Sequence, residues 1–468
     1  MAFLLGGANS ASGGYNIENS CRWNDGDSPQ LSDAIASTSA SWTFSAWAKR
    51  GDDFTSNNYI ISWSTSGTDG TGIGFGTTSK FFYYSEDDPN ILVESAGSYR
   101  DPSAWYHCVV KCDSGTVTLY INGASVASGS GGNALDTSTV KIGCWLGDNL
   151  FHDGYVSEIY FIDGTAYSAS TFGETDGDSG IWKPKNASVT YGTHGFRMEF
   201  KQTGTDTDAS GIGADTSGND NHFAVANLAA TDITTDTPTN NFCTLNPLAN
   251  AIANPITLSE GNLKALGDSD SWEGVASTMG VKNGKWYWEA KLADLYDDDA
   301  GTAGADGDYA HVGIYNDDAV ASGGLESYFG HVGAGIAYGK GQDTTIHGRP
   351  TTSTTYGSTH TDDDIISMAL DLDNNFIYFA KNGTYHDYDS VTGVPTSGSS
   401  GTGGFAIPAN EVYLPGVACY QATWEMNFGN PAFAISSGNA DANGYGNFEF
   451  AVPSGYYALC TKNLAEYG

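Results

Sequence analysis

The sequence predicts an all-β protein made of two antiparallel β-sandwich domains joined by a polar connector. Glycine accounts for 61 of the 468 residues and aromatic residues for 13%, a composition typical of many short strands separated by turns. No amphipathic pattern is long enough for three helical turns. One strand–turn–strand pattern occurs twice, far apart in the chain, and indicates two domains of related design.

This repeated pattern is a two-stranded ribbon followed by Asn-Gly. In the later copy, residues 366–372 alternate between apolar and polar or small side chains, 373–375 read Asp-Asn-Asn, and 376–380 form an aromatic return strand. Asp and Asn tolerate a left-handed backbone, so the middle segment predicts a hairpin turn. The earlier copy runs from 109 to 123. The two ribbons lie roughly 260 residues apart, which argues against a short-period repeat.

The chain is strongly acidic, with 19 Lys and Arg against 55 Asp and Glu and a formal net charge of −36. A surface of this sign repels phosphate backbones and anionic lipids, so we expect no nucleic-acid partner and no membrane insertion. The first residues lack the basic start and long apolar run of a secretory signal, so we expect synthesis in a cytoplasm.

The seven cysteines are odd in number and irregularly spaced, with no Cys-x-x-Cys pair. This pattern favours reduced, buried thiols over a disulfide framework or a zinc site. We therefore expect no metal held by thiolates.

The first domain is expected over residues 1–200, with its core at 20–165. Short apolar and aromatic runs between turn residues predict its strands. Taken in order, several of these segments resemble the laminin-G/concanavalin A-like lectin pattern, which implies a jelly-roll β-sandwich. The segments that carry this resemblance are 43–48, 105–110, 119–123, 141–143 and 153–159.

Two further stretches resemble segments of tailed-phage virion proteins. One is Phe-Ile-Asp-Gly-Thr at 161–165 followed by Gly-Ile-Trp-Lys-Pro-Lys at 180–185, and the other is the tail at 453–464. The resemblance implies a virion structural protein in which a lectin-like sandwich is displayed on the particle.

Residues 201–246 are the least hydrophobic part of the chain, and 231–239 consist mostly of Thr, Asp and Pro. We interpret this segment as the polar connector. Four apolar residues could hold it against a neighbouring domain: Phe223, Val225, Leu228 and Phe242.

The second domain is expected over 247–468, with its core at 255–430. Its ordered motifs resemble SPRY domains, which implies a second antiparallel β-sandwich that binds partners through loops. These motifs are Gly-Lys-Trp-Tyr-Trp-Glu at 284–289, Val-Gly-Ile at 312–314, Phe-Ala-Lys-Asn-Gly at 379–383, Tyr-Leu-Pro at 413–415 and Asn-Phe-Gly at 427–429.

The sequence contains no pattern of catalytic residues. A glycosidase of this fold needs two carboxyl groups on one face, and no strand alternates acids in that way. Asp371 and Asp373 are two residues apart, but Asp373 lies in the turn, where acids commonly bond turn amides. His107 and His311 fall within strands and are expected to be packed. No nucleophile elbow, zinc-protease or P-loop motif occurs, so we expect a protein that is not an enzyme.

No cofactor is expected. Acidic loops at 297–299, 306–308 and 362–364 carry oxygen ligands that suit Ca²⁺, but their spacing matches no calcium loop. We interpret these loops as solvated acidic surface.

Two patches in the first domain are candidate sugar sites. Sugar binding combines an aromatic face with Asp or Asn hydrogen bonds at a loop rim. Trp145 beside Asp148 and Asn149 fits this pattern, as does the pair Tyr83 and Tyr84 ahead of an acidic stretch. For each patch, aromatic residues that pack in the core are the alternative interpretation.

The lectin resemblance adds two residues to the first patch, because laminin-G-like relatives can place a metal or sugar before the corresponding strand. The residues concerned are Asp148, Asn149, His152 and Asp153. A plain turn is the alternative.

The two sandwiches, the acidity and the missing catalytic motifs predict a protein that is not an enzyme, and the resemblance to tailed-phage proteins implies a virion protein. We expect a tail fibre or adsorption appendage on the virion surface, made in the bacterial cytoplasm, contacting other virion proteins and a host surface glycan, and forming a homo-oligomer, with a trimer as the first guess. The alternatives are a capsid or tail decoration protein that makes mainly protein–protein contacts, and a polysaccharide depolymerase. Display in several copies would strengthen weak glycan sites through avidity.

Overall fold

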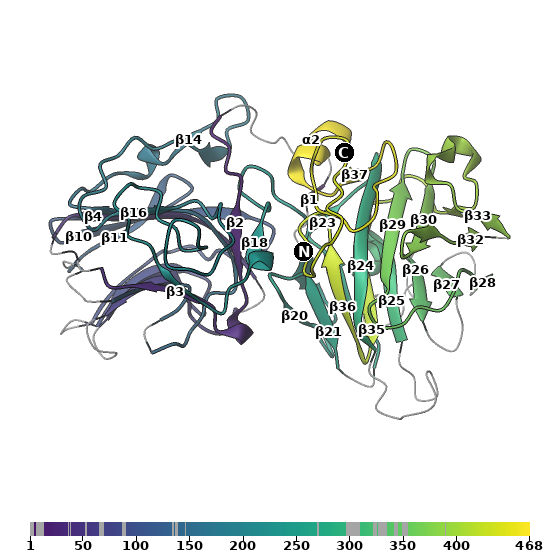
Figure 1. Cartoon of the computed structure of the whole chain (residues 1–468), viewed down its shortest axis with the longest axis horizontal. Coiled ribbons are helices and arrows are strands. Elements are labelled where there is room, and N and C mark those ends of the chain that lie inside the picture. The colour runs from purple at the N-terminus through teal and green to yellow at the C-terminus, as the bar shows by residue number, and fades with distance from the viewer. Residues whose placement is uncertain are drawn as a thin grey trace. The chain divides into compact units, whose positions relative to one another are not determined.

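The structure is a computed structural model that describes residues 4–5, 14–35, 37, 39–51, 54–64, 70–86, 90–132, 135, 139–145, 147–268, 271–295, 309–321, 325, 335–340, 345–348, 354–388 and 390–468. The chain forms two compact units (Figure 1). We call Ser10–Asn241 the N-terminal sandwich, and Met1–Asn9 together with Phe242–Gly468 the C-terminal sandwich.

The N-terminal sandwich has two antiparallel sheets. We call the sheet that contains β4, β9 and β13 the inner-strand sheet, and the sheet that contains β5, β6 and β7 the platform sheet. The inner-strand sheet has the order β11-β10-β9-β4-β13-β2-β18, with β16 also pairing with β13. Its strands are β2 (Ser20–Trp23), β4 (Trp42–Arg50), β9 (Trp105–Asp113), β10 (Thr116–Ile121), β11 (Ala124–Ser130), β13 (Gly154–Asp163), β16 (Phe196–Met198) and β18 (Ile233–Thr234).

The platform sheet has the order β17-β3-β12-β5-β6-β7-β8. Its strands are β3 (Gln30–Asp33), β5 (Asn58–Ser64), β6 (Gly70–Phe75), β7 (Phe81–Ser85), β8 (Ile91–Glu94), β12 (Thr139–Ile142) and β17 (Ala224–Ala226). The short elements of this unit are the hairpin β14 (Gly173–Thr175) and β15 (Trp182–Pro184), and the 3-10 turns η1 (Asp25–Asp27), η2 (Ala169–Thr171) and η3 (Ala230–Asp232).

Aromatic residues fill the space between these two sheets. Trp42 of β4 is fully buried, and its ring lies 6.2 Å from that of Trp63 and 6.0 Å from that of Tyr83. Phe161 of β13 completes the group, 6.4 Å from Trp42. Such a core is the expected result of strands that alternate inward apolar residues with outward ones.

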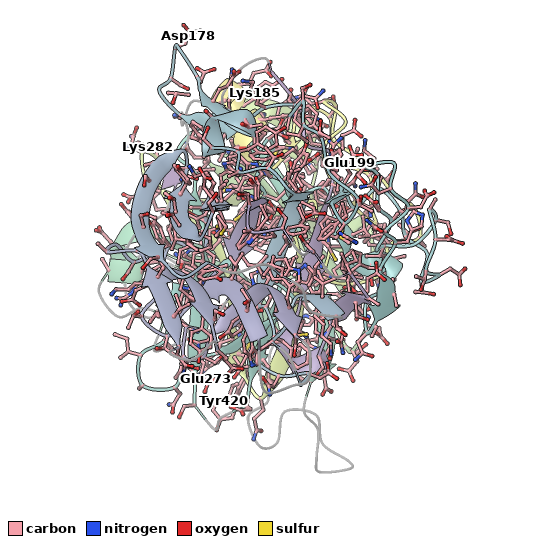
Figure 2. All side chains as sticks on the ribbon, turned by 90° about the vertical axis from the view of Figure 1, so that its left-hand side faces the viewer. Asp178, Lys185, Glu199, Glu273, Lys282 and Tyr420 are labelled. Atoms are coloured by element: carbon pink, nitrogen blue, oxygen red, sulfur yellow. The ribbon has the colours of Figure 1, made fainter. Side chains whose placement is uncertain are left out.

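Segments before and after the strands pack on the outer face of the inner-strand sheet, among them Ile17 and Trp182. Trp182 of the β14–β15 hairpin donates a hydrogen bond from Nε1 to His107 Nδ1 at 3.0 Å, and His107 stacks on Trp47. Asp178 lies at the exposed end of this hairpin, which projects from the body in Figure 2. His107 is therefore packed, as its place in a strand predicted.

Most of the segment expected to be a connector, residues 201–241, is part of the N-terminal sandwich, and residues 242–246 belong to the C-terminal sandwich. Within 201–246, β17 pairs with β3 and β18 pairs with β2, and the division between units falls after Asn241. Phe223 is buried with its ring 4.8 Å from that of Phe196. The physical reason is that a few well-spaced apolar residues are enough to dock a polar segment whose backbone also completes two sheets.

The C-terminal sandwich also has two sheets. The first has the order β19-β22-β35-β25-β26-β27-β28. Its strands are β19 (Leu245–Asn250), β22 (Glu273–Ser277), β25 (Tyr309–Asn316), β26 (Gly335–Lys340), β27 (Thr345–Gly348), β28 (Thr354–Thr355) and β35 (Tyr413–Tyr420).

The second sheet has the order β20-β21-β36-β24-β29-β30-β31, with β34 pairing with β30 and β37 with β24. Its strands are β20 (Thr257–Ser259), β21 (Lys264–Gly267), β24 (Lys285–Leu295), β29 (Ile365–Asp371), β30 (Phe376–Lys381), β31 (Thr384–Tyr385), β34 (Phe405–Ala406), β36 (Ala422–Asn427) and β37 (Tyr457–Ala458). The remaining elements are the pairs β1 (Leu4–Leu5) with β23 (Met279–Gly280) and β32 (Asp387–Tyr388) with β33 (Val391–Thr392), the helices α1 (Asp317–Ala321) and α2 (Thr461–Tyr467), and η5 (Pro395–Ser400).

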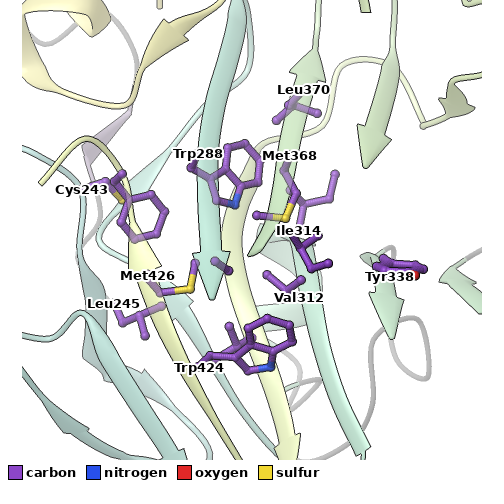
Figure 3. Close-up of a cluster of buried hydrophobic side chains, with 14 of the residues drawn as sticks. Cys243, Leu245, Trp288, Val312, Ile314, Tyr338, Met368, Leu370, Trp424 and Met426 are labelled. Atoms are coloured by element: carbon purple, nitrogen blue, oxygen red, sulfur yellow. The ribbon is translucent and has the colours of Figure 1, made fainter. Parts of the chain in front are cut away.

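The core between these sheets is again aromatic. Trp288 of β24 and Trp424 of β36 are fully buried with Met368 of β29 and Met426 (Figure 3). Val312 of β25 faces them from the opposite sheet. The two sheets thus enclose one continuous apolar layer.

Both predicted ribbons are present. β29 pairs with β30, and Asn375 in their turn has φ of 64°. β9 pairs with β10, and Ser114 in that turn has φ of 50°. The prediction of an all-β fold with two antiparallel sandwiches is confirmed. In the part of the chain that the structure describes, no helix combines the length and the apolar character needed to cross a membrane.

Candidate functional site

Three of the seven predicted site residues lie in the interior of the N-terminal sandwich. Tyr83 is fully buried in the aromatic core beside Trp42. His152 is also fully buried, and burial lowers its pKa to about 3, with the nearby Arg50 guanidinium acting in the same direction. Asp153 is buried as well. These three side chains are therefore not presented to a ligand at the surface.

The other three residues of the first patch lie on a surface turn. Trp145 and Asn149 form an antiparallel bridge that closes a short loop, and Asp148 within it has φ of 55°. Asp148 and Asn149 are exposed, and Trp145 is half-buried. The Asp148 carboxylate pairs with Lys141 Nζ on the neighbouring strand β12. The turn therefore carries an aromatic face and polar groups next to one another.

The structure joins the two predicted patches. Tyr84 of β7 is half-buried, and its ring centroid lies 5.9 Å from that of Trp145. Tyr59 of β5 lies 4.6 Å from Trp145, and Phe82 of β7 lies 5.2 Å from Tyr59. We call Tyr59, Phe82, Tyr84 and Trp145 the aromatic platform, which lies on the outer face of the platform sheet.

Glycine in the neighbouring strand makes room for this platform. A Cβ at Gly72 of β6 would lie 2.5 Å from the Tyr59 ring and 2.7 Å from the Trp145 ring. Gly72 pairs with Ser62 on one side and Tyr84 on the other, so it forms the floor between the rings. Gly72 is thus a position at which a strand glycine permits close approach.

Polar groups border the platform. Asn90 donates a hydrogen bond from Nδ2 to the Tyr84 hydroxyl at 3.2 Å. The Tyr59 hydroxyl has a pKa raised above its ordinary value, first by burial and then by the neighbouring Tyr84 and Glu86 groups. With Asp148 and Asn149 on the turn, the rim offers amides, hydroxyls and carboxylates. Leu92, which pairs with Tyr84 across β7 and β8, adds a side chain that is 57% exposed.

This arrangement suits a polyhydroxylated ligand. The apolar faces of sugar rings stack on aromatic side chains, and their hydroxyls hydrogen-bond to amides and carboxylates. Within the described residues, no group of three or more His, Cys, Asp or Glu side chains is placed to hold a metal ion. The platform presents a stacking surface with hydrogen-bonding groups beside it.

The acidic residues singled out in the second domain have structural partners. Asp371 is fully buried, pairs with Lys285 at 2.7 Å and accepts a hydrogen bond from the Asn374 backbone N–H at 3.0 Å. In the loop 362–364, Asp363 pairs with Lys291 and Asp364 with Lys381. The acidic loops at 297–299 and 306–308 and the acids at 87–88 lie outside the described residues.

A second aromatic group lies on the outer face of the first sheet of the C-terminal sandwich. Trp272 stacks on Tyr309 with ring centroids 5.3 Å apart, and Tyr420 lies 5.9 Å from Tyr309. Beneath them His311 is buried, 4.6 Å from Trp272. Figure 2 labels Tyr420 near Glu273; Glu273 is the first residue of β22 and Tyr420 is the last residue of β35. Like the platform, this group was not predicted as a unit.

The family comparison agrees with the fold of the first unit. A model of the concanavalin A-like lectin/glucanases superfamily matches residues 24–171. This range contains β3 to β13 and all four residues of the aromatic platform. The lectin-like pattern predicted for the first domain is therefore confirmed for this range. No curated protein matches the chain.

Solved structures show more distant similarities. The SPRY domain of human HERC1 is 17% identical, covering 35% of this chain and 87% of that one, with a TM-score of 0.24. Domain 4 of AbnA, an extracellular arabinanase from Geobacillus stearothermophilus in complex with arabinotriose, is 18% identical, covering 28% and 64%, with a TM-score of 0.25. The CBM40 of the Ruminococcus gnavus IT-sialidase, bound to α2,3-sialyllactose, is 11% identical, covering 35% and 96%, with a TM-score of 0.26. Similarities this low do not place the chain in any of these families.

Proposed function

We propose that the N-terminal sandwich binds a glycan on its aromatic platform, and that the chain is a recognition protein and not an enzyme. The main support for the proposal is that the ring centroids of Tyr84 and Trp145 lie 5.9 Å apart, beside exposed Asp148 and Asn149. This combines a stacking surface with hydrogen-bonding groups that can orient sugar hydroxyls. The match to a lectin and glucanase superfamily over the same residues supports the same class of ligand.

The setting we propose is the surface of a tailed-phage particle, in an adsorption appendage such as a tail fibre. Support for this part comes from the sequence resemblance at 161–165, 180–185 and 453–464. Other virion proteins are then the permanent partners, and a host surface glycan is the transient one. A homo-oligomer, for which we propose a trimer, would present several platforms at once and raise the apparent affinity through avidity.

A glycan array probed with the full-length chain tests the binding proposal. We expect a defined set of glycans to bind the wild type and to be lost in Trp145→Ala. Trp272→Ala is the matched control, since it removes a half-buried tryptophan from the C-terminal sandwich. Absence of binding by the wild type, or equal binding by Trp145→Ala, contradicts the proposal.

A decoration role, in which the chain makes mainly protein contacts, is favoured by one observation on the C-terminal sandwich. Ile252 is 90% exposed and Leu248 is 47% exposed on the same stretch of chain. Exposed apolar side chains grouped in this way are typical of protein-contact surfaces. Labelling intact particles with an antibody to the chain separates the roles, because a fibre is labelled at the tail and a head decoration over the capsid.

A further inference from the structure

A buried Lys–Asp–Asn group lies at the end of the N-terminal sandwich. Lys49 of β4 is 1% exposed, and its Nζ lies 2.8 Å from Asp236 Oδ2 and 2.8 Å from Asn241 Oδ1. Asp236 is fully buried. The side-chain carbonyl of Asn241 therefore faces the amine, and its Cγ is one bond beyond the oxygen that Nζ contacts.

The local chain path explains how Asp236 and Asn241 come together. Between them, Thr237 and Asn240 form an antiparallel bridge, with backbone hydrogen bonds in both directions at 3.2 and 3.0 Å. This tight turn brings the two flanking side chains to the same amine. The Ser20 hydroxyl donates to the Asp236 backbone carbonyl at 2.6 Å and fixes the turn against β2.

Two further hydrogen bonds set the orientation of the reacting groups. Asn241 donates from Nδ2 to the Ser103 carbonyl at 2.6 Å, so the amide cannot turn its nitrogen toward Lys49 without losing this bond. Trp105 donates from Nε1 to Asp236 Oδ1 at 3.1 Å, which leaves Oδ2 directed at the amine. Lys49 Nζ also lies 5.4 Å from the centre of the buried Tyr155 ring.

We propose that Lys49 and Asn241 form an intramolecular isopeptide bond, with Asp236 as the proton carrier. Asp236 Oδ2, 2.8 Å from Nζ, is placed to accept a proton from the lysine, which leaves a nucleophilic amine 2.8 Å from the Asn241 side-chain oxygen. Held against the amide carbon, it benefits from the high effective concentration of an intramolecular reaction.

The chemistry balances without a co-reactant. Nζ of the neutral lysine attacks Cγ of Asn241, the new C–N bond forms, and the C–Nδ2 bond breaks after Nδ2 takes a proton from the attacking nitrogen through Asp236. Ammonia leaves, and Asp236 keeps the proton that the lysine first gave up. The products are a neutral amide, a neutral carboxylic acid and ammonia, so no oxidant or reductant is required.

Two other Lys–Asp–Asn groups in the C-terminal sandwich provide the contrast. Around Asp371, Asn374 donates its Nδ2 to the carboxylate and Lys285 is 21% exposed. Around Asp364, Asn382 likewise donates its Nδ2, and the lysine is 24% exposed. In both groups the amide nitrogen bonds the acid and the lysine is open to water, so these groups lack the geometry needed for attack.

The proposed bond ties β4 to the last residue of the unit. Residues 49 and 241 are 192 positions apart, so the cross-link closes a loop that contains most of the N-terminal sandwich. A covalent link of this span reduces the conformational entropy of the unfolded chain. It also prevents the last residue of the unit from separating from β4. Such a link would suit a protein that is pulled during attachment, although the bond itself does not depend on glycan binding.

Mass spectrometry of the full-length chain tests the proposal. The denatured wild type is expected to be lighter than its sequence mass by one ammonia, and a tryptic digest is expected to contain a branched peptide joining Lys49 to Asn241. Asn241→Ala and Asp236→Ala are expected to restore the full mass, whereas the control Asn374→Ala keeps the loss. A wild-type chain at its full sequence mass, or one that loses ammonia without the branched peptide, overturns the proposal. Neither outcome requires any variant to fold, and neither depends on a ligand.

Discussion

The two sandwiches use half-buried aromatic residues in different surroundings. In the N-terminal sandwich, Trp145 and Tyr84 lie beside exposed Asp148 and Asn149, and a strand glycine keeps the space between rings open. In the C-terminal sandwich, Trp272 and its neighbours lie over a buried histidine on the face of a sheet. We therefore propose the sugar site at the first group, where exposed Asp148 and Asn149 lie beside the rings.

The largest expected effect separates a core tryptophan from the platform. Trp42→Ala removes the centre of the N-terminal core and should lower the free energy of unfolding of that unit by about 3–5 kcal/mol. Trp145→Ala, at a half-buried surface position, should lower it by less. Denaturant unfolding followed by circular dichroism measures both. Similar losses for the two variants would mean that the platform is part of the core and not a surface.

Adding one methyl group should damage the platform while leaving the core intact. Gly72→Ala places a Cβ between the Tyr59 and Trp145 rings, which must then separate. We expect glycan affinity to fall about tenfold, equivalent to about 1.4 kcal/mol, because stacking requires the rings to keep their positions. Titration calorimetry measures the change, with Gly177→Ala in the β14–β15 hairpin as the control, since a Cβ there meets nothing within 4 Å. Unchanged affinity in Gly72→Ala would contradict the role given to the platform.

The N-terminal sandwich should also lose stability in acid through His107. Burial lowers the pKa of His107 to about 3, below its ordinary value of 6.5. Between these two pH values the unfolded chain binds a proton at this histidine more readily than the folded chain does. The contribution of neutral His107 to the free energy of unfolding is therefore fully present above pH 6.5 and decreases as the pH falls toward 3. The bond that Trp182 donates to Nδ1 requires the neutral ring. Its loss would release the β14–β15 hairpin.

Thermal unfolding of wild type and His107→Gln at several pH values between 7 and 4 tests this. The glutamine can keep one donor and one acceptor but does not titrate. We expect the melting temperature of the variant to vary less with pH in this range. An identical pH dependence in both proteins would show that other groups control the acid sensitivity.

The smallest expected effect concerns the ion pair at the rim of the platform. Asp148 is 54% exposed and Lys141 is 17% exposed, so their pairing is screened by water. Asp148→Asn should change the free energy of unfolding by about 0.5 kcal/mol or less, as for other surface pairs. Denaturant unfolding measures it. A loss of several kcal/mol would show that the turn is held by this pair and not by the Trp145–Asn149 bridge.

The fold could be predicted from the sequence because the patterns that encode it are local. Alternating runs and Asp, Asn and Gly turns are encoded within a few neighbouring residues, as in β29 and β30. The aromatic platform could be predicted only in part, because the pairing of strands brings together residues that are distant in the sequence. Tyr59 and Gly72 meet Trp145 through pairing of β5 with β6, which no local pattern reveals.

Two pairs of adjacent residues show that residue type alone does not predict which side chains are exposed. Tyr83 and Tyr84 were predicted together, but successive strand residues face opposite sides, so one enters the core and the other reaches the platform. His152 and Asp153 look like a polar turn in sequence but are buried. The group of Lys49, Asp236 and Asn241 brings together residues 187 and 192 positions apart, a proximity set by the tertiary fold.

The most direct test of the account is a calorimetric titration of one array-positive glycan against three full-length proteins: wild type, Trp145→Ala and Trp272→Ala. The account predicts that Trp145→Ala weakens binding about tenfold or more while Trp272→Ala binds like the wild type. Binding that survives in Trp145→Ala and is lost in Trp272→Ala would place the site on the other sandwich and contradict the central claim.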